Sequence, residues 1–151
     1  MNQVTVADSQ RTKRLNRAFL KRVAEELLSK RLELEDAEVG FDFVSDKRMA
    51  EINQQYLGHE GSTDVITFPY SESDGPLQGD IFICVDEAIR QSRTFKTNWQ
   101  QEVVRYMVHG ILHLLGEDDL KPELRRKMKR KENRLVEELG KDFSFSEVEK
   151  K

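Results

Sequence analysis

The sequence contains few residues that form cross-links or bind metals tightly. Its single cysteine, Cys84, excludes an intramolecular disulfide and lies in the apolar run IFICV, which predicts a buried position on a strand. A fourth metal ligand or a redox-sensitive thiol is the alternative, although no neighbouring residue supports either role. There are only three histidines in 151 residues, so a pair of them at a regular spacing is informative.

Long hydrophobic segments are absent as well. No apolar run approaches the ~18 residues that a membrane-spanning helix needs. The first ten residues, MNQVTVADSQ, do not contain the apolar stretch of a secretory signal peptide. We therefore expect a cytoplasmic protein that does not associate with membranes.

The overall composition is that of a folded domain. Hydrophobic residues make up 37% of the chain, which is enough apolar material for one modest core. A length of 151 residues suits a single domain. We expect this domain to span residues 1–140, and residues 141–151 to form a flexible C-terminal tail.

The charges are strongly segregated along the chain, although the net charge is only −3. Residues 11–31 and residues 121–134 each contain eight basic and two acidic side chains, whereas residues 32–87 contain fourteen acidic and two basic ones. Solvated helix faces would explain this pattern. Two basic helices that bind a polyanion would explain it equally well.

Hydrophobic periodicity predicts an α+β fold. Apolar residues at every fourth position indicate an amphipathic helix over residues 12–29, and alternation over residues 39–43 indicates a strand. The other expected elements are a short helix capped by Ser45 or Asp46, strands at 64–68 and 80–85 separated by a polar loop at 71–79, a helix capped by Asp86, a helix at 99–115, and a last helix from Pro122 to about Leu139, capped by Asp119 or a neighbour. The order αβαββααα predicts one small mixed sheet with helices packed against it.

The most apolar predicted helix carries two histidines. Residues 99–115, WQQEVVRYMVHGILHLL, are apolar around much of the helix, so this helix should be buried at the centre of the fold. His109 and His113 lie four positions apart, which places both imidazoles on one face with Cβ atoms ~5–6 Å apart. Gly116 allows the chain to leave the helix in a left-handed conformation and to bring a residue near 119 back to the histidines.

A carboxylate at that point would complete a metal site. Asp119 with the two histidines gives a His₂–carboxylate set with one open position, the arrangement of a catalytic zinc site. Two alternatives remain open: the histidines are core residues bonded to the backbone, or Asp119 is a helix N-cap while Asp118 or Glu117 is the ligand. Gly110 occupies the position at which HExxH zinc peptidases carry their glutamate base, so peptide hydrolysis is disfavoured.

Three segments of the sequence resemble those of a known family. Residues 109–119, HGILHLLGEDD, are similar to the H-G-x-L-H-L-x-G-Y-D-H signature of the YbeY family, the bacterial ribosomal RNA maturation endoribonucleases. Asn53-x-x-Tyr56 followed by STDVITFP at 62–69 resembles the family's N-x-x-Y/F-R…P-T-D-V-L-S-F-P, and GDI at 79–81 resembles its G-D-I strand. The matches occur in the family's order and cover roughly residues 40–120.

The resemblance implies a zincin-like α+β fold and a metal-dependent hydrolase domain that cleaves single-stranded RNA. It implies one Zn²⁺ per chain, held by His109, His113 and residue 119, and a role in 16S ribosomal RNA 3′-end maturation and ribosome quality control. The expected partners are ribosomal RNA and the small ribosomal subunit or its proteins. The basic segments would then contact the RNA backbone, and the candidate contacts are Arg14, Arg17, Arg125, Arg126 and Lys129.

Two departures from the family pattern concern the site. The family usually has histidine as the third ligand, where this chain has Asp119, and a carboxylate is also a legitimate zinc ligand. The family usually has arginine after the Tyr/Phe, where this chain has Leu57, which removes the expected cation for a phosphate. His59 in the same loop, or Arg105 one turn before His109, is the candidate catalytic replacement. The alternatives are an exposed loop histidine and an ion-paired arginine.

Two aspartates at predicted strand ends, Asp64 and Asp80, have two interpretations. Each forms a turn or cap, or each hydrogen-bonds a metal-bound histidine. Two other functions compete with the nuclease. A non-catalytic, zinc-containing ribosome-assembly factor is favoured by Leu57, and a zinc peptidase is disfavoured by Gly110.

Overall fold

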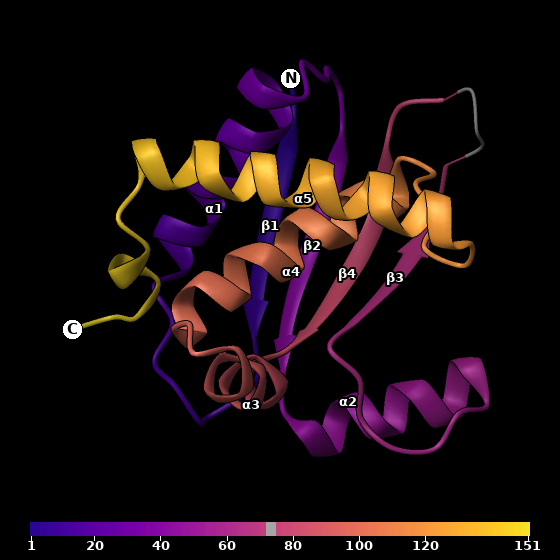
Figure 1. Ribbon diagram of the computed structural model, residues 1–151, viewed down its shortest axis with the longest axis vertical. Helices are drawn as coiled ribbons and strands as arrows, with labels where there is room; N and C mark the ends of the chain where they lie inside the picture. The colour runs from indigo at the N-terminus through magenta and orange to yellow at the C-terminus, as the bar shows by residue number, and fades with distance from the viewer. Residues whose placement is uncertain (72–74) are drawn as a thin grey trace.

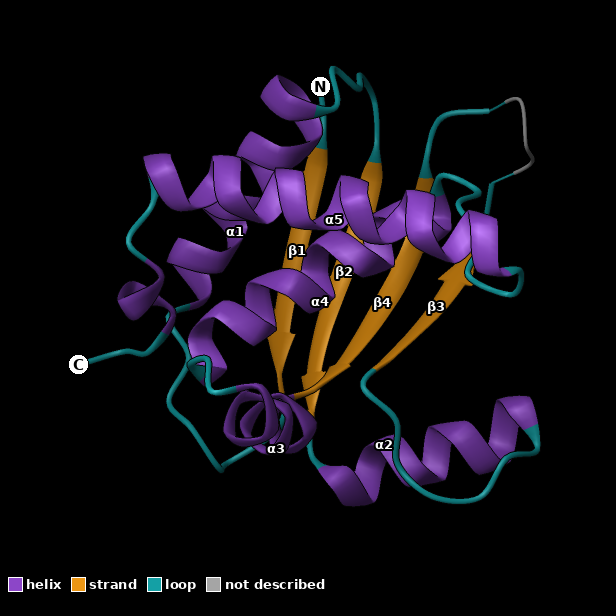
Figure 2. Ribbon diagram, viewed as in Figure 1, coloured by secondary structure: helices purple, strands orange, loops and turns teal. Residues whose placement is uncertain are grey.

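A four-stranded sheet lies at the centre of the protein, and most of the helices cover one of its faces (Figures 1 and 2). The computed structural model describes residues 1–71 and 75–151. The strand order is β1-β2-β4-β3, with β3 antiparallel to β4 and the other neighbours parallel. The strands are β1 (Gln3–Asp8), β2 (Glu38–Val44), β3 (Val65–Pro69) and β4 (Gln78–Cys84). The predicted α+β class with a small mixed sheet is confirmed, and the zincin-like classification stays a prediction.

The helices begin and end close to the predicted positions. They are α1 (Arg17–Glu26), α2 (Asp46–Ile52), α3 (Val85–Phe95), α4 (Trp99–Leu114) and α5 (Pro122–Asp142), with the π-helical turns η1 (Leu27–Arg31) and η2 (Asn53–Leu57) and the 3-10 turn η3 (Phe145–Val148). The central helix α4 packs against β3, β4, α3 and α5 (Figure 1). Within the described residues, no helix is long and apolar enough to cross a membrane.

Side-chain alternation on the strands explains why α4 lies where it does. On β2 the side chains of Val39, Phe41 and Phe43 are buried in the main core, and on β4 so are Ile81 and Ile83. Successive strand residues face opposite sides of the sheet, so these five side chains form one apolar face. Burial of this face against the apolar surface of α4 fixes that helix over the sheet.

Several local expectations are corrected by the structure. Strand β1 was not predicted, although Val4 and Val6 alternate with polar residues and pair with β2. Asp86 does not cap α3, which begins at Val85; its carboxylate accepts the backbone N–H of Asp46 instead, at 2.8 Å. The predicted loop at 71–79 is described only in part, because residues 72–74 lie outside the described residues.

The C-terminal segment packs against the domain. We expected a flexible tail at 141–151, whereas α5 continues to Asp142 and η3 follows it. Val148 is fully buried in the main core, and Glu149 forms a β-bridge with Leu15. The apolar residues in this segment explain the difference, since their burial offsets the entropy of ordering the chain.

Candidate metal centre

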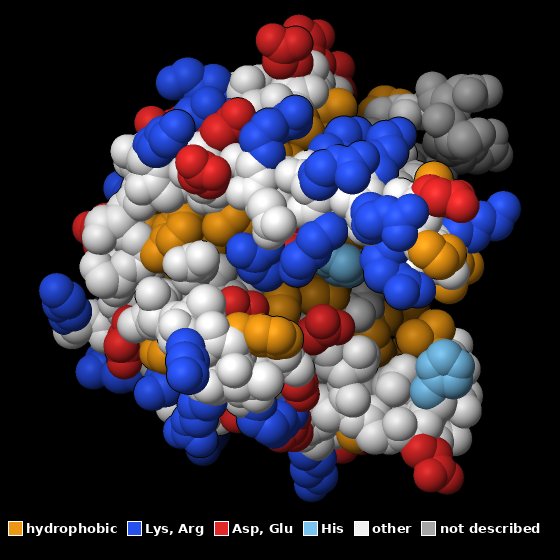
Figure 3. All heavy atoms as spheres, in the orientation of Figure 1, with side chains coloured by type: hydrophobic (Ala, Val, Ile, Leu, Met, Phe, Trp, Pro, Cys, Tyr) orange, Lys and Arg blue, Asp and Glu red, His pale blue; other side chains and the backbone are white. Residues whose placement is uncertain are grey.

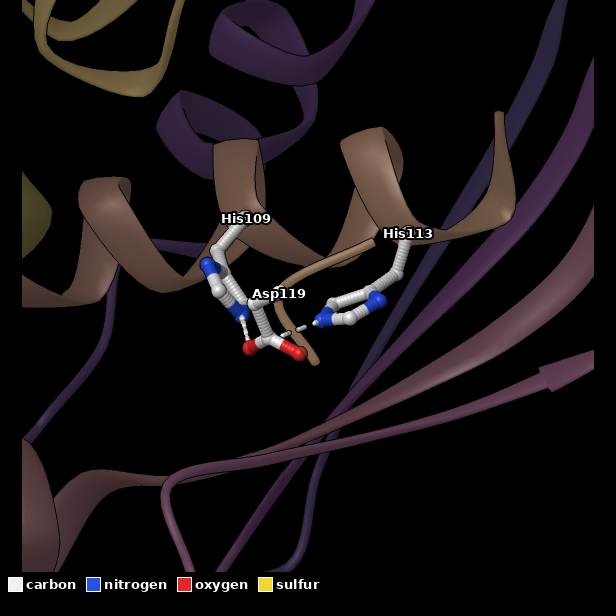
Figure 4. A group of neighbouring side chains, drawn as sticks. All are labelled: His109, His113 and Asp119. Carbon is white, nitrogen blue, oxygen red and sulfur yellow. Dashed lines mark ion pairs between the residues drawn. The ribbon is translucent and has the colours of Figure 1, made fainter. Parts of the chain in front are cut away.

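His109 and His113 project from the same face of α4 (Figure 4). The helix is capped by Asn98, whose side chain accepts a hydrogen bond from the Gln101 N–H at 2.8 Å. The imidazole centroids lie 4.7 Å apart with an interplanar angle of 72°. A buried, well-capped helix therefore holds the two rings in a fixed relation.

The turn after α4 returns the chain to these rings. Gly116 has φ +94°, in the left-handed region that the sequence predicts for it. Its N–H donates to the His113 carbonyl and the Glu117 N–H donates to the Leu112 carbonyl, both at 3.0 Å, which is the Schellman pattern of a helix C-terminus. The Arg125 Nε–H donates to the Asp119 carbonyl at 3.0 Å and secures the end of the turn.

Asp119 is the acidic residue that this turn places beside the histidines. Its Oδ2 lies 4.0 Å from His109 Nε2 and 3.6 Å from His113 Nε2, and the three donor atoms lie within 4.8 Å of one another. Zinc–ligand bonds of ~2.0–2.1 Å in tetrahedral geometry place donor atoms ~3.3 Å apart, so a small contraction suffices. The three residues can therefore hold one metal ion.

The other two acids of the turn have different partners. Asp118 Oδ1 accepts the Leu120 N–H at 2.7 Å, and Glu117 forms an ion pair with Lys131 at 3.6 Å. Helix α5 has Lys121 as its N-cap and no side-chain cap bond, so the interpretation of Asp119 as a helix cap is wrong. Asp119 is thus left with its carboxylate directed at the two rings.

Glu132 orients the first histidine, a role that was not predicted from the sequence. Its Oε1 lies 2.7 Å from His109 Nδ1, which leaves Nε2 of that ring facing Asp119. Metal-bound histidines commonly use their second nitrogen in this way. Glu132 is 3% exposed although it belongs to a basic segment. The signal was its helical spacing, because Met128, Glu132 and Val136 recur every four residues on the buried face of α5.

Charges around Glu132 compensate its burial. Burial raises the pKa of Glu132, but hydrogen bonds from His109 and Arg105 and the charge of Lys129 bring it down to about 2. Burial lowers the pKa of His109. This effect is outweighed by the hydrogen bond and charge of Glu132 and by the charges of Asp64 and Asp119, so the pKa of His109 is raised. When His109 is protonated, the two residues therefore form a buried ion pair.

Gly110 has a packing role that explains why no glutamate follows His109. A Cβ atom at this position would lie 2.6 Å from Ile81 Cγ2 on β4, closer than atoms can approach. A larger side chain would push α4 away from the sheet. The position used by the base of HExxH peptidases is therefore occupied by the contact between α4 and β4.

Comparison with known proteins assigns the chain to a family. The sequence model of the family described as endoribonuclease YbeY matches residues 3–140. The chain belongs to the YbeY endoribonuclease family. The endoribonuclease YbeY of Chlorobium phaeovibrioides is 40% identical over 105 residues, which is 70% of each chain. That of Parabacteroides distasonis is 40% identical over 99 residues, 66% of this chain and 69% of the relative.

A solved structure shares the fold. The solution structure of a Thermotoga maritima protein superposes with a TM-score of 0.67 at 28% sequence identity, covering 94% of this chain and 91% of that one. The family resemblance inferred from three motifs is confirmed, and it extends well beyond residues 40–120. The N-terminal strand and most of α5, including Glu132, lie within the segment that the YbeY model matches.

The two candidate catalytic cations of this YbeY member lie in different surroundings. Arg105 donates to Glu132 at 2.9 Å and to Asn133 at 2.6 Å, so the predicted alternative of an ion-paired arginine applies, with Glu132 as the acid. His59 is exposed and lines a cavity of about 300 Å³ together with Leu57 and His113. Arg105 therefore holds the carboxylate that bonds to His109, and His59 lies in the cavity on the His113 side.

Neither aspartate of the predicted supporting pair bonds to a histidine in the described residues. Asp64 immediately precedes β3 and accepts the Val65 N–H at 2.8 Å, so it acts on His109 only through its charge. Asp80 lies on the sheet face opposite to Ile81, where it accepts a hydrogen bond from the Tyr70 hydroxyl at 2.8 Å. The strand alternation that buries Ile81 under α4 directs Asp80 away from the metal centre.

The predicted RNA contacts fall into two groups. Arg125, Arg126 and Lys129 line a groove of about 560 Å³ together with His109 and Asp119. Figure 3 shows Lys and Arg side chains gathered along a hollow in which a histidine is visible. Arg14 and Arg17 line another cavity, which Lys150 also borders. The structure thus brings the α5 residues, but not those near α1, to the metal centre.

Proposed function

We propose that this YbeY family member is a zinc-dependent endoribonuclease that cleaves single-stranded RNA. The observation that carries the proposal is the grouping of His109, His113 and Asp119 beside a groove with a basic rim, which His109 and Asp119 line. Phosphodiesters are polyanions, so the rim attracts the substrate and the three-ligand set supplies the reacting centre. One Zn²⁺ per chain fits two imidazoles and a carboxylate.

Each residue of the site would have a separate role in hydrolysis. Zinc, when bound, provides Lewis acidity and lowers the pKa of water to ~7. Glu132 keeps His109 in the tautomer whose Nε2 is free, and Arg105 holds Glu132 in place. Arg125 and Arg126 hold backbone phosphates in the groove. His59, which lines the cavity on the His113 side, would donate a hydrogen bond to the reacting phosphate or to its leaving oxygen.

The family relationship supports a ribosomal substrate. We infer that the enzyme takes part in 16S ribosomal RNA 3′-end maturation and in ribosome quality control, with the small ribosomal subunit or its proteins as partners. Arg14 and Arg17, which lie outside the groove, would contact only RNA long enough to extend along the surface. Among the described residues that line this second site there is no aromatic side chain, so its contacts would be to phosphates.

The test is cleavage of single-stranded RNA by the zinc-loaded protein, compared with its variants. We expect His113→Ala and Asp119→Ala to lose both stoichiometric zinc and cleavage. The matched control is Asp118→Ala, which removes the neighbouring carboxylate and should retain both. Stoichiometric zinc without cleavage, at low salt and with small ribosomal subunits offered as substrate, would contradict the nuclease proposal.

A second candidate function is a ribosome-assembly factor that does not turn over RNA. The observation that favours it is Leu57, which is 47% exposed and lines the cavity beside His113 where the family usually places arginine. This candidate predicts that His113→Ala still binds the small subunit and still supports its maturation. The nuclease proposal predicts that binding persists while maturation fails.

A further inference from the structure

The groove between α3, α4 and α5 extends well beyond the metal ligands. It encloses about 560 Å³, within the ~300–1,000 Å³ typical of sites for small organic groups. Its walls include the apolar surfaces of Phe95, Tyr106 and Met128, and His109 and Asp119 border it on the metal side. A metal ion and a phosphate would leave most of this space unfilled.

Tyr106 lines this wall and carries an unpaired polar group, its buried hydroxyl. The residue is 5% exposed, and its hydroxyl is buried without a hydrogen-bond partner among the residues that the structure describes. Such groups are rare, because a buried hydroxyl without a partner has lost its bonds to water. Burial raises the pKa of Tyr106, and the charges of Asp64 and Glu102, which also line the groove, raise it further. The hydroxyl thus keeps its proton and has no acceptor among the described residues.

Two further features of the groove match a nucleotide. Phe95, at the C-terminal end of α3, is 66% exposed and borders the groove with its ring. Exposed aromatic rings bind single-stranded nucleic acids by stacking on bases of any sequence. Arg125, Arg126 and Lys129 on the opposite wall, from α5, provide the positive charge that phosphates require.

We propose that this groove is a nucleobase site in which one unstacked base of the RNA lies against Phe95 while the Tyr106 hydroxyl donates a hydrogen bond to the base edge. The proposal rests on the proposed nuclease function for its substrate. It adds to that function a reason for single-strand specificity, since a base can enter the groove only when it is free of a duplex. The basic rim favours this occupant over an apolar peptide, because a nucleotide carries phosphates that can pair with Arg125 and Arg126 and an apolar peptide carries no such anion.

The test separates base-dependent from phosphate-dependent binding. The two probes are a short oligouridine and an abasic ribose-phosphate chain of the same length and charge. Binding to the zinc-loaded protein is followed by fluorescence anisotropy immediately after mixing, before cleavage. We expect wild type to bind oligouridine at least ~5-fold more tightly than the abasic chain, because stacking acts on only one probe.

Substitutions test which residues cause the difference in affinity between the two probes. Tyr106→Phe should weaken oligouridine binding ~3–10-fold and leave abasic binding unchanged, because it removes one hydrogen bond and keeps the ring. Phe95→Ala should act in the same direction. Arg126→Ala should weaken both probes, because it removes a phosphate contact. The melting temperature of free Tyr106→Phe should equal or exceed that of wild type, since the lost hydroxyl has no partner to leave behind.

The outcomes distinguish this inference from the proposed function. Equal affinity of wild type for the two probes, or an equal loss on both in Tyr106→Phe, would overturn the nucleobase site even if RNA is cleaved. A lower melting temperature of Tyr106→Phe would also overturn it, by assigning the hydroxyl a structural bond. Base-dependent binding without any cleavage would uphold the site and reject the nuclease.

Discussion

Replacing Glu132 with alanine should weaken metal binding and destabilise the protein together. His109 would lose the carboxylate that fixes its tautomer at 2.7 Å, and Arg105, whose side chain is 19% exposed, would lose its acidic partner. Loss of such a supporting residue typically lowers metal affinity ~10–100-fold. Removal of one partner from a buried ion pair costs about 3–5 kcal/mol of folding free energy.

The assays are chelator competition for zinc affinity and urea unfolding of the metal-free protein for stability. Glu132→Gln retains an acceptor for His109 and should lose less zinc affinity than Glu132→Ala. Glu123→Ala, in the exposed first turn of α5, is the matched control and should change neither quantity. Unchanged zinc affinity in Glu132→Ala would refute the assignment of Glu132 to the metal centre.

The pH dependence of stability provides an independent check on the same pair. The pKa of Glu132 falls from 4.5 to about 2 on folding, so its contribution is present above pH 4.5 and is lost as the pH falls toward 2. A shift of this size corresponds to roughly 3 kcal/mol. The pKa of His109 is raised above 6.5, so its contribution is complete below pH 6.5 and is lost as the pH rises through the folded value. Metal-free Glu132→Ala should therefore show a flatter pH profile than wild type, and an identical profile would contradict the pairing.

Three further predictions follow from the packing and the charges. Gly110→Ala should lower the free energy of unfolding by about 1–3 kcal/mol in urea titrations, because its Cβ meets Ile81, and an unchanged midpoint would disprove this contact. Deletion of residues 144–151 should cost about 1.5–3 kcal/mol, since it exposes the site of fully buried Val148, whereas a truly flexible tail would be removed without effect. For the double variant Arg125→Ala/Arg126→Ala, the slope of the logarithm of short-RNA affinity against the logarithm of salt concentration should become shallower, by an amount equivalent to roughly two phosphate contacts. Arg14→Ala/Arg17→Ala should affect only longer RNA, and equal effects of both pairs on a short oligonucleotide would contradict the division into two groups.

The features that could be predicted from the sequence are those that local rules determine. The apolar character of residues 99–115 identified the buried helix, and the spacing of His109 and His113 placed them on one face. Gly116 marked the turn because only glycine adopts φ +94° without strain. Ser45, one of the two predicted caps of α2, accepts the Arg48 N–H with its side chain.

The features that were missed depend on contacts distant in the sequence. Glu132 lies in a basic segment, and only the packing of α5 on α4 shows that it faces His109. Asp80 was predicted at the start of a strand but is the third residue of β4, and strand alternation places its side chain on the face away from α4. Strand β1 is short and half polar, and it becomes a strand because β2 provides a parallel partner. Val148 similarly needs the core to bury it.

X-ray absorption spectroscopy of the zinc-loaded protein tests the central claim most directly. Two imidazole nitrogens and one carboxylate oxygen at ~2.0–2.1 Å, with a further light atom in the remaining position, are expected for His109, His113 and Asp119. His113→Ala should remove the second imidazole from the spectrum or abolish zinc binding. A wild-type spectrum with a single imidazole, with sulfur from Cys84, or with four protein ligands and no exchangeable position would contradict the account.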